Sequence, residues 1–315
     1  MRIAVTGCGG RLGRALLAAL VEAPFAGPSG TLGWDLPEHD LDTRGTDARL
    51  IERDRPDVVI HTAAWTDVDG CARDPDLAVR RNGTAVGELA GACLAAGVDL
   101  VLVSTNEVFD GRRTDGRGYR PSDLPRPINA YGASKLAGEI AARTAFVRGG
   151  GVVEADRGEP PPARPRLAIV RTAWLYGPPG NDFPAKILAA ADRARAAGES
   201  LRVVGDEVGS PTYTVDLARA VARLVGAGSF AGVHHVVNGG TASRAAWARE
   251  VLRLVGNDVA VEEVPSATWR RASSPPLWAV LEPTLLPSGR PLRPWPEALA
   301  EYVPALLGQR AEPTR

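Results

Sequence analysis

The sequence is poor in the residues that build disulfide frameworks and zinc sites. Its 315 residues include three cysteines, Cys8, Cys71 and Cys93, which are scattered without metal-ligand spacing. The four histidines do not complete a ligand set with them. We therefore expect reduced thiols in a cytoplasmic protein, and no metal site.

Net charge and long apolar runs are also absent. The formal net charge is zero, with 37 basic and 37 acidic side chains, so the composition favours neither a nucleic-acid nor a membrane surface. No apolar run approaches the roughly 20 residues that cross a bilayer. The N-terminus already reads as a strand, so we expect no signal peptide. With 44% hydrophobic residues, the chain can bury a sizeable core.

Lysine is the rarest of the charged residues. The chain holds only Lys135 and Lys186, and nearly all other basic residues are arginine. Because the sequence otherwise uses arginine, a lysine is stronger evidence than usual that its position requires lysine. Lys135 is therefore a candidate functional residue.

Apolar strand-like runs alternate with helical patterns through the first half of the chain. We expect strands at 2–6, 31–34, 57–61, 99–103 and 167–171, and helices at 12–21, 78–96 and 130–145. The strands are near-continuous apolar runs, as expected where helices cover both faces of a sheet. This alternation predicts an α/β fold with a doubly wound parallel sheet.

A change of pattern after residue 176 predicts a second, smaller α/β domain. We assign 1–176 and about 212–240 to a dinucleotide-binding domain, and 177–211 and 241–315 to a substrate domain. The last part is rich in proline and tryptophan, and we expect it to be irregular. Residues 147–165 are rich in glycine and proline, and we expect them to form a flexible surface insertion.

Further elements are expected after the insertion. Helices are predicted at 183–198 and 215–225, and strands at 202–204 and 233–237.

The first strand runs directly into the glycine-rich segment TGCGGRLG. Gly7, Gly10 and Gly13 have G-x-x-G-x-x-G spacing between a strand and a helix. Glycine allows a tight turn and a close approach to phosphate, and the helix N-terminus offers free N–H groups. The segment, with Arg11 and Leu12, therefore predicts a dinucleotide pyrophosphate site.

Acidic residues follow the second strand. Asp35 lies where an acid binds the hydroxyls of the adenosine ribose and favours NADH, because it repels a 2′-phosphate. Arg11 and Arg14 lie close enough in sequence to accept the 2′-phosphate of NADPH, so the choice of cofactor stays open. Leu41 and Asp42 belong to a second acidic segment that we expect at the adenine.

The third strand ends in HTAAWTDVD, residues 61–69. Ala63 and Ala64 are small, so a cofactor can lie close to the backbone there. Trp65, Thr66 and Asp67 follow at the carboxyl end of the strand, where ligands of such sheets bind.

Tyr131 and Lys135, in the segment YGASK, lie four residues apart and therefore on one face of a helix. A phenol has a pKa near 10, and a nearby ammonium favours its ionised form. The tyrosine can then donate or accept a proton as hydride moves. The pair predicts a nicotinamide-dependent oxidoreductase.

Together these residues resemble the extended short-chain dehydrogenase/reductase family, whose nucleotide-binding part is a Rossmann fold. Five ordered motifs are similar to one branch, the dTDP-4-dehydrorhamnose reductases: AAWTDVD (63–69), STNEVFDG (104–111), YGASKLAGE (131–139), RTAWLYG (171–177) and GDEVGSPTY (205–213). The resemblance covers nearly the whole chain, apart from the insertion and the tail.

The resemblance implies reduction of the C4 ketone of a dTDP-4-dehydro-6-deoxyhexose by NADPH or NADH, in deoxysugar or rhamnose biosynthesis. Tyr131 would protonate the ketone oxygen, Lys135 would hold the nicotinamide ribose, and Thr105 would orient the ketone. Ser104 would lie beside the cofactor. The expected substrate side comprises Thr66, Val68, Thr105, Asn106, Glu107, Trp174, Asn181 and Phe183. A homodimer is one expected assembly.

Asn106 and Glu107 depart from that branch, which usually has Asp-Tyr at these positions. Thr-Asp-Glu would offer an acid and a base for dehydration, whereas Asn106 cannot donate a proton as a carboxylic acid does. We expect both residues to shape the sugar pocket, so that Asn106→Asp keeps activity within about tenfold. Two alternatives stay open: an epimerase or dehydratase on the same fold, and a non-catalytic nucleotide-binding regulatory subunit.

Overall fold

A parallel sheet of six strands forms the centre of the computed structural model, which describes residues 1–154, 165–228 and 230–311, with side chains as far as Gly308 in the last helix. The strands are β1 (Ile3–Thr6), β2 (Thr31–Trp34), β3 (Val58–His61), β4 (Asp99–Thr105), β5 (Leu167–Thr172) and β10 (Gly232–His235). Their order is β10-β5-β4-β3-β1-β2, and every neighbouring pair is parallel. The expected doubly wound sheet is confirmed.

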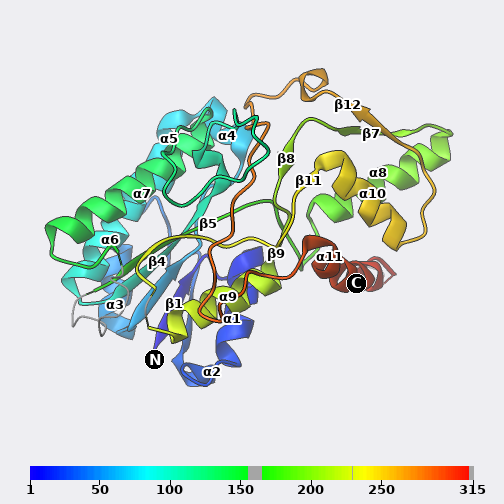
Figure 1. Cartoon of the computed structure of the whole chain (residues 1–315). Coiled ribbons are helices and arrows are strands. Elements are labelled where there is room, and N and C mark those ends of the chain that lie inside the picture. Colours follow the sequence, from blue (N-terminus) through cyan, green and yellow to red (C-terminus); the bar gives the residue numbers. More distant parts are fainter. Residues whose placement is uncertain (155–164, 229, 312–315) are drawn as a thin grey trace.

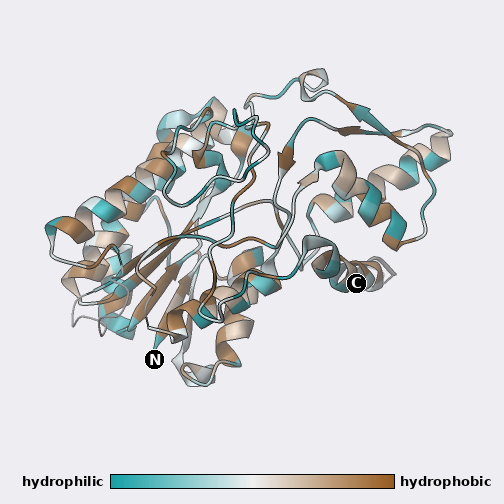
Figure 2. Ribbon diagram, viewed as in Figure 1, coloured by the Kyte–Doolittle hydropathy of each residue, from teal (hydrophilic) through white to brown (hydrophobic). Residues whose placement is uncertain are grey.

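Helices cover both faces of this sheet (Figure 1). On one face, α1 (Arg11–Val21) packs against α9 (Thr214–Gly226). The other face carries α3 (Thr46–Asp54), α6 (Ala85–Ala95) and α7 (Ala130–Arg148). Figure 2 shows the strands between these layers as largely hydrophobic. Burial on both faces explains why the strands are continuous apolar runs rather than alternating ones.

The remaining elements lie mainly in the smaller part of the chain, to the right of the sheet in Figure 1. They are β6 (Leu175–Tyr176), α8 (Phe183–Ala197), β7 (Leu201–Val204), β8 (Val208–Gly209), β9 (Thr212–Tyr213), β11 (Ala242–Ser243), α10 (Arg244–Leu254), β12 (Val261–Val264) and α11 (Trp295–Ala311). Short helical turns elsewhere are α2 (Gly27–Gly30), α4 (Val68–Arg73), α5 (Pro75–Val79), η2 (Asn106–Val108) and η3 (Ser266–Thr268).

The smaller part has its own hydrophobic core, built around the buried rings of Tyr176, Trp247 and Tyr302. The expectation that the last part of the chain is irregular is confirmed for residues 269–294, which form no helix or strand of their own, and is wrong for α10 and α11, which bury apolar faces in this core. The predicted division into two domains stays a proposal. It is supported by the separation of this core from those that flank the main sheet.

The single helix expected at 78–96 is interrupted by a π-helical turn, η1 (Arg80–Thr84). Asn82, in this turn, is buried and accepts a hydrogen bond from the Trp65 backbone N–H at 2.8 Å. Its Nδ2 donates to the Trp65 carbonyl and to Ser134 Oγ, both at 3.0 Å. The turn therefore ties the loop after β3 to helix α7.

The predicted insertion at 147–165 begins later than expected, because α7 continues through Arg148. Val152 then forms an isolated parallel bridge with Arg166, just before β5. The rest of that prediction, at 155–164, lies outside the described residues. In the part of the chain that the structure describes, no helix combines the length and the apolar character needed to cross a bilayer.

Candidate active site

A cavity of about 750 Å³ lies at the carboxyl ends of β1, β3 and β4. Polar and glycine-rich loops from segments far apart in the sequence meet there. The structure brings these predicted residues into its lining: Gly7, Gly10, Arg11, Leu12, Gly13, Asp35, Leu41, Ala63, Ala64, Trp65, Thr66, Val68, Ser104, Thr105, Asn106, Glu107, Tyr131, Lys135 and Trp174. Ligands of open α/β sheets bind at this edge, where the strand order reverses between β1 and β3.

The glycine loop after β1 forms a cradle with room for phosphate. Gly7 has φ +63°, and a Cβ there would lie 2.9 Å from the backbone of Ala63. Gly10 is the N-cap residue of helix α1. Because glycine has no side chain, no side-chain cap accepts hydrogen bonds from the first N–H groups of the helix. These features fit the pyrophosphate of a dinucleotide, because uncapped helix N–H groups and a positive dipole attract anions.

Asp35, at the end of β2, is held at the rim of this cradle. Its carboxylate accepts hydrogen bonds from the backbone N–H groups of Gly9 at 2.5 Å and Leu36 at 2.9 Å. Arg14 Nε donates to the Gly9 carbonyl at 2.7 Å and does not line the cavity. The carboxylate is therefore fixed where it can face ribose hydroxyls, and its role in binding them stays a prediction.

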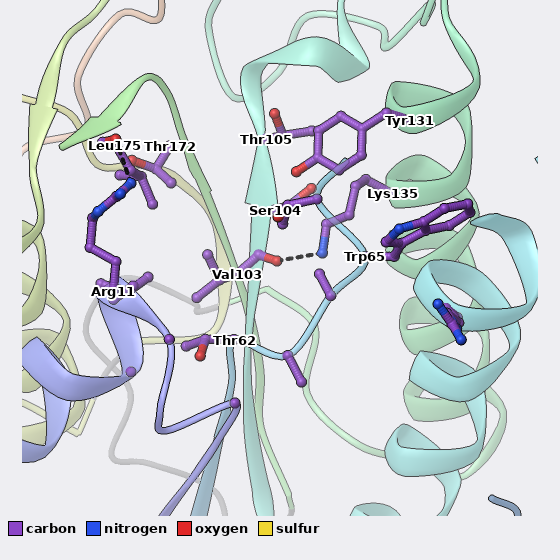
Figure 3. Close-up of a pocket in the computed structure, with 18 of the residues that line it drawn as sticks. Arg11, Thr62, Trp65, Val103, Ser104, Thr105, Tyr131, Lys135, Thr172 and Leu175 are labelled. Atoms are coloured by element: carbon purple, nitrogen blue, oxygen red, sulfur yellow. Dashed lines mark hydrogen bonds between the residues drawn. The ribbon is translucent and has the colours of Figure 1, made fainter. Parts of the chain in front are cut away.

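Arg11 links the cradle to the smaller part of the chain. Its guanidinium donates to the Leu175 carbonyl at 3.3 Å and also to Asn181 Oδ1. Figure 3 shows Arg11 extending toward Leu175 along the side of the cavity opposite Tyr131 and Lys135. Asn181 is thus engaged by Arg11 instead of lining the cavity.

Tyr131 and Lys135 project from one face of α7 toward the end of β4 (Figure 3). Lys135 Nζ donates to the Val103 carbonyl at 2.9 Å. Burial lowers the pKa of Lys135 to about 8, and the negative charge of Glu139 opposes this shift. Lys135 therefore remains mostly an ammonium at neutral pH.

Tyr131 is held as a neutral phenol. Burial raises its pKa well above the ordinary value, and the charge of Glu107 raises it further, while a hydrogen bond with Thr105 opposes both. A neutral phenol beside an ammonium can donate a proton to a ligand oxygen. The arrangement is therefore suited to protonating an oxygen that becomes negatively charged.

Asn106 has two partners in a buried setting. Its Nδ2 donates to the Ala279 carbonyl at 3.0 Å, and its Oδ1 accepts from the Thr105 hydroxyl at 3.2 Å. The backbone N–H of Glu107 donates to Thr105 Oγ1 at 3.2 Å. These contacts fix the Thr105 hydroxyl at the cavity wall.

Arg244, at the start of α10, lines the cavity and was not predicted. Its guanidinium carbon lies 3.6 Å from the centre of the Trp174 ring, a cation–π geometry. Its Nε lies 3.4 Å from the buried carboxylate of Glu207, which Arg271 also approaches at 3.0 Å. Burial lowers the pKa of Arg244 to about 10, an effect that Glu207 opposes. No sequence signal distinguishes this arginine from the many others.

Arg14 and Asp67 lie outside the lining, and so do three residues that were expected to bind the cofactor or the substrate. Asp42 accepts hydrogen bonds from Arg81, whose guanidinium stacks 5.5 Å from the Trp65 ring centre, and Phe183 stacks on Trp247 at 4.4 Å. Asn181 is the third. The binding roles of all three stay predictions.

Among the described residues, no group of three or more His, Cys, Asp or Glu side chains is placed to hold a metal ion.

A parallel sheet, a phosphate cradle at its first turn, and a half-buried tyrosine with a buried lysine on the same helix face define the class of extended short-chain dehydrogenases/reductases. A family model described as the RmlD substrate binding domain matches residues 1–307. A dTDP-4-dehydrorhamnose reductase from Streptomyces griseus is 37% identical over 98% of this chain and 95% of its own length. The chain therefore belongs to the dTDP-4-dehydrorhamnose reductase family of oxidoreductases, and the predicted resemblance is confirmed.

Solved structures agree with this assignment. A dTDP-4-dehydrorhamnose reductase from Clostridium acetobutylicum has a TM-score of 0.84 and 32% identity, covering 98% of this chain and 100% of that one. A dTDP-4-dehydrorhamnose reductase from Bacillus anthracis, solved in complex with NADP, has a TM-score of 0.82 and 29% identity, covering 96% and 99%.

Proposed function

We propose that this protein reduces the C4 ketone of a dTDP-4-dehydro-6-deoxyhexose in deoxysugar biosynthesis, with NADPH or NADH as hydride donor. One observation carries the proposal: Thr105, Tyr131 and Lys135 meet in the same cavity as the phosphate cradle. The names of the related reductases supply the substrate class, and the relative solved with NADP supplies the cofactor class.

Three residues of the protein have separate roles in the reduction. When the substrate binds, the Thr105 hydroxyl turns its proton from Asn106 Oδ1 to the ketone oxygen and orients the ketone, and Tyr131 donates its phenolic proton to that oxygen. Lys135, as an ammonium, favours the phenolate that remains. When bound, the reduced nicotinamide supplies the hydride.

The substrate side of the cavity is proposed to lie along Trp174 and Arg244. The indole of Trp174 offers an apolar surface for a deoxysugar ring, and Arg244 offers a fixed positive charge for the diphosphate. Because Glu207 and the indole hold the guanidinium in place, little side-chain entropy remains to be lost on binding.

The dehydratase alternative is disfavoured by Asn106. Its amide is buried and already engaged with Ala279 and Thr105, and an amide cannot protonate a leaving hydroxyl. The regulatory-subunit alternative is disfavoured by the intact set of Thr105, Tyr131 and Lys135, which nucleotide binding alone does not require.

The test mixes purified protein, NADPH or NADH, and a 4-keto sugar made from dTDP-glucose by a dehydratase, with and without an epimerase. We expect loss of the reduced-nicotinamide absorbance, and a loss of rate of about 10²- to 10⁴-fold in Tyr131→Phe. If no 4-keto sugar consumes the cofactor, while Tyr131→Phe binds nucleotide unchanged, the result favours the regulatory-subunit alternative over a reductase.

We further propose a cytoplasmic location and a homodimer. Cys8, Cys71 and Cys93 are free thiols, as in proteins of reducing compartments, which supports the cytoplasmic location.

The homodimer is supported by an exposed apolar stripe on α7, where Ile140 and Val147 lie two turns apart on the outer face of the helix. Cell fractionation and light scattering on purified protein test the two proposals.

A further inference from the structure

Glu107 is a carboxyl group in the cavity that ketone reduction leaves without a task. The proton for the ketone oxygen comes from Tyr131, and the hydrogen bond that orients the ketone comes from Thr105. A carboxylate costs free energy to bury, so its presence beside these groups calls for a chemical explanation.

The side chain of Glu107 is positioned rather than free. Its Oε2 accepts a hydrogen bond from Asn129 Nδ2 at 2.8 Å, at the N-terminus of α7. Its Oε1 has no hydrogen-bond partner among the described residues, and the residue lines the cavity. One oxygen is therefore anchored, and the other is available to a ligand.

Tyr131 and Glu107 line the same cavity, and the charge of Glu107 raises the pKa of the phenol. Burial raises the pKa of Glu107 itself, and Asn129 opposes the shift. The other charged groups that act on Glu107 are Arg244, Glu207 and Arg271. A carboxylate whose pKa is shifted toward neutrality is a better match for a general base than an ordinary one.

The proposed substrate has ring C–H groups on both sides of its ketone, at C3 and C5. Such protons are acidic, because the electron pair left on carbon delocalises into the carbonyl. We propose that Glu107 is a general base for one of these protons, so that the protein catalyses proton exchange at a ring carbon next to the ketone. This inference rests on the proposed function for its substrate.

The step balances without any further reactant. Glu107 Oε1 takes the proton from the ring carbon, and the C–H electron pair becomes the carbon–carbon double bond of an enolate. The carbonyl π electrons move to oxygen, where the hydroxyl groups of Thr105 and Tyr131 stabilise the charge. Return of a proton from Glu107 to the same carbon restores the ketone, after exchange of the carboxyl proton with solvent.

The test measures exchange separately from reduction. The 4-keto sugar is made in H₂O, the dehydratase is filtered off, and the sugar is transferred into D₂O with the protein and NADP⁺, which cannot reduce it. Proton NMR follows the C3 and C5 signals. A sample without protein gives the chemical background, and cofactor titration and thermal unfolding check that each variant is folded.

We expect wild-type protein to exchange one ring position about 100-fold faster than background. Glu107→Gln should bring exchange to background, and Glu107→Asp should retain part of it, because a carboxylate is still present. Background exchange by wild-type protein that reduces the sugar normally overturns the inference and leaves the proposed function standing. Wild-type exchange in folded Glu107→Gln also overturns it. Absence of both reactions overturns the proposed function as well.

Discussion

Glu139 and Arg171 form a two-point ion pair inside the protein, with Nε–Oε1 at 3.0 Å and Nη2–Oε2 at 2.7 Å. Both side chains are almost wholly buried, with 3% and 4% of their surface exposed. The hydroxyl of Ser104 donates to the same carboxylate at 2.5 Å. Glu139 also lies one helical turn beyond Lys135 on α7, so the pair connects the end of β5 to the catalytic helix, and Ser104 connects the end of β4 to it.

Removing one partner of the Glu139–Arg171 pair should destabilise the folded protein. Glu139→Gln leaves the Arg171 guanidinium buried without its counter-charge, and we expect a loss of about 3–5 kcal/mol in the free energy of unfolding. Urea denaturation measures it. Replacing both residues by Met should recover most of the loss, because neither position then leaves an unpaired charge of the Glu139–Arg171 pair in the interior. A single variant within about 1 kcal/mol of wild type would contradict this.

Activity should fall in alkaline solution because of Lys135. Its pKa is lowered to about 8, so the ammonium is present below that pH and is lost as the pH rises through it. We expect kcat/KM for ketone reduction to decline above pH about 8, since kcat/KM reports the free enzyme.

The same pH profile tests the part that Glu139 plays. Its negative charge raises the pKa of Lys135, so Glu139→Gln should move the alkaline decline to lower pH. A profile that stays flat to pH about 10 in both proteins would show that the charge of Lys135 is not required.

Asn106→Asp should lower the free energy of unfolding, an effect that the sequence alone does not indicate. The amide donates to the Ala279 carbonyl, and a carboxylate oxygen in its place would face that carbonyl oxygen in a buried setting. We expect a loss of stability of about 1–3 kcal/mol. Thermal and urea unfolding measure it, together with kcat for the ketone. Unchanged stability and activity would restore the original expectation that Asn106 only shapes the pocket.

Arg244→Ala should weaken binding of the sugar nucleotide. The guanidinium stacks on Trp174 in the cavity, and its loss removes a charge proposed to meet the diphosphate. We expect KM to rise by about tenfold to 100-fold, or ~1.4–2.8 kcal/mol. Arg249→Ala is the matched control, since Arg249 lies on the same helix with an exposed partner, Glu263. Equal effects of the two substitutions would contradict the assignment.

Much of the fold and of the catalytic set is readable from the sequence, because both depend on local signals. Buried parallel strands are apolar runs, and Tyr131 and Lys135 share a helix face through their spacing alone. The π-helical turn at Arg80–Thr84 is different, because Asn82 finds its partner in the loop after β3.

The substrate side of the cavity is also hard to predict from the sequence, because it depends on contacts between residues that are far apart in the chain. Arg244 acquires its place from Trp174 and Glu207, which are remote in the sequence and meet it only in the folded chain. The helices of the last part form because their apolar faces find a core around Trp247. Neither contact leaves a local pattern of the kind that marks the glycine loop.

The most direct test of the account follows the hydride itself. Wild-type protein is given the 4-keto sugar and NADPH that carries deuterium at the transferable position of the nicotinamide, and the product is examined by NMR and mass spectrometry. The account predicts one deuterium at C4 of the sugar ring, and almost no product from Tyr131→Phe. Deuterium that stays on the cofactor while the sugar is unchanged, or that appears at another ring carbon, would contradict it.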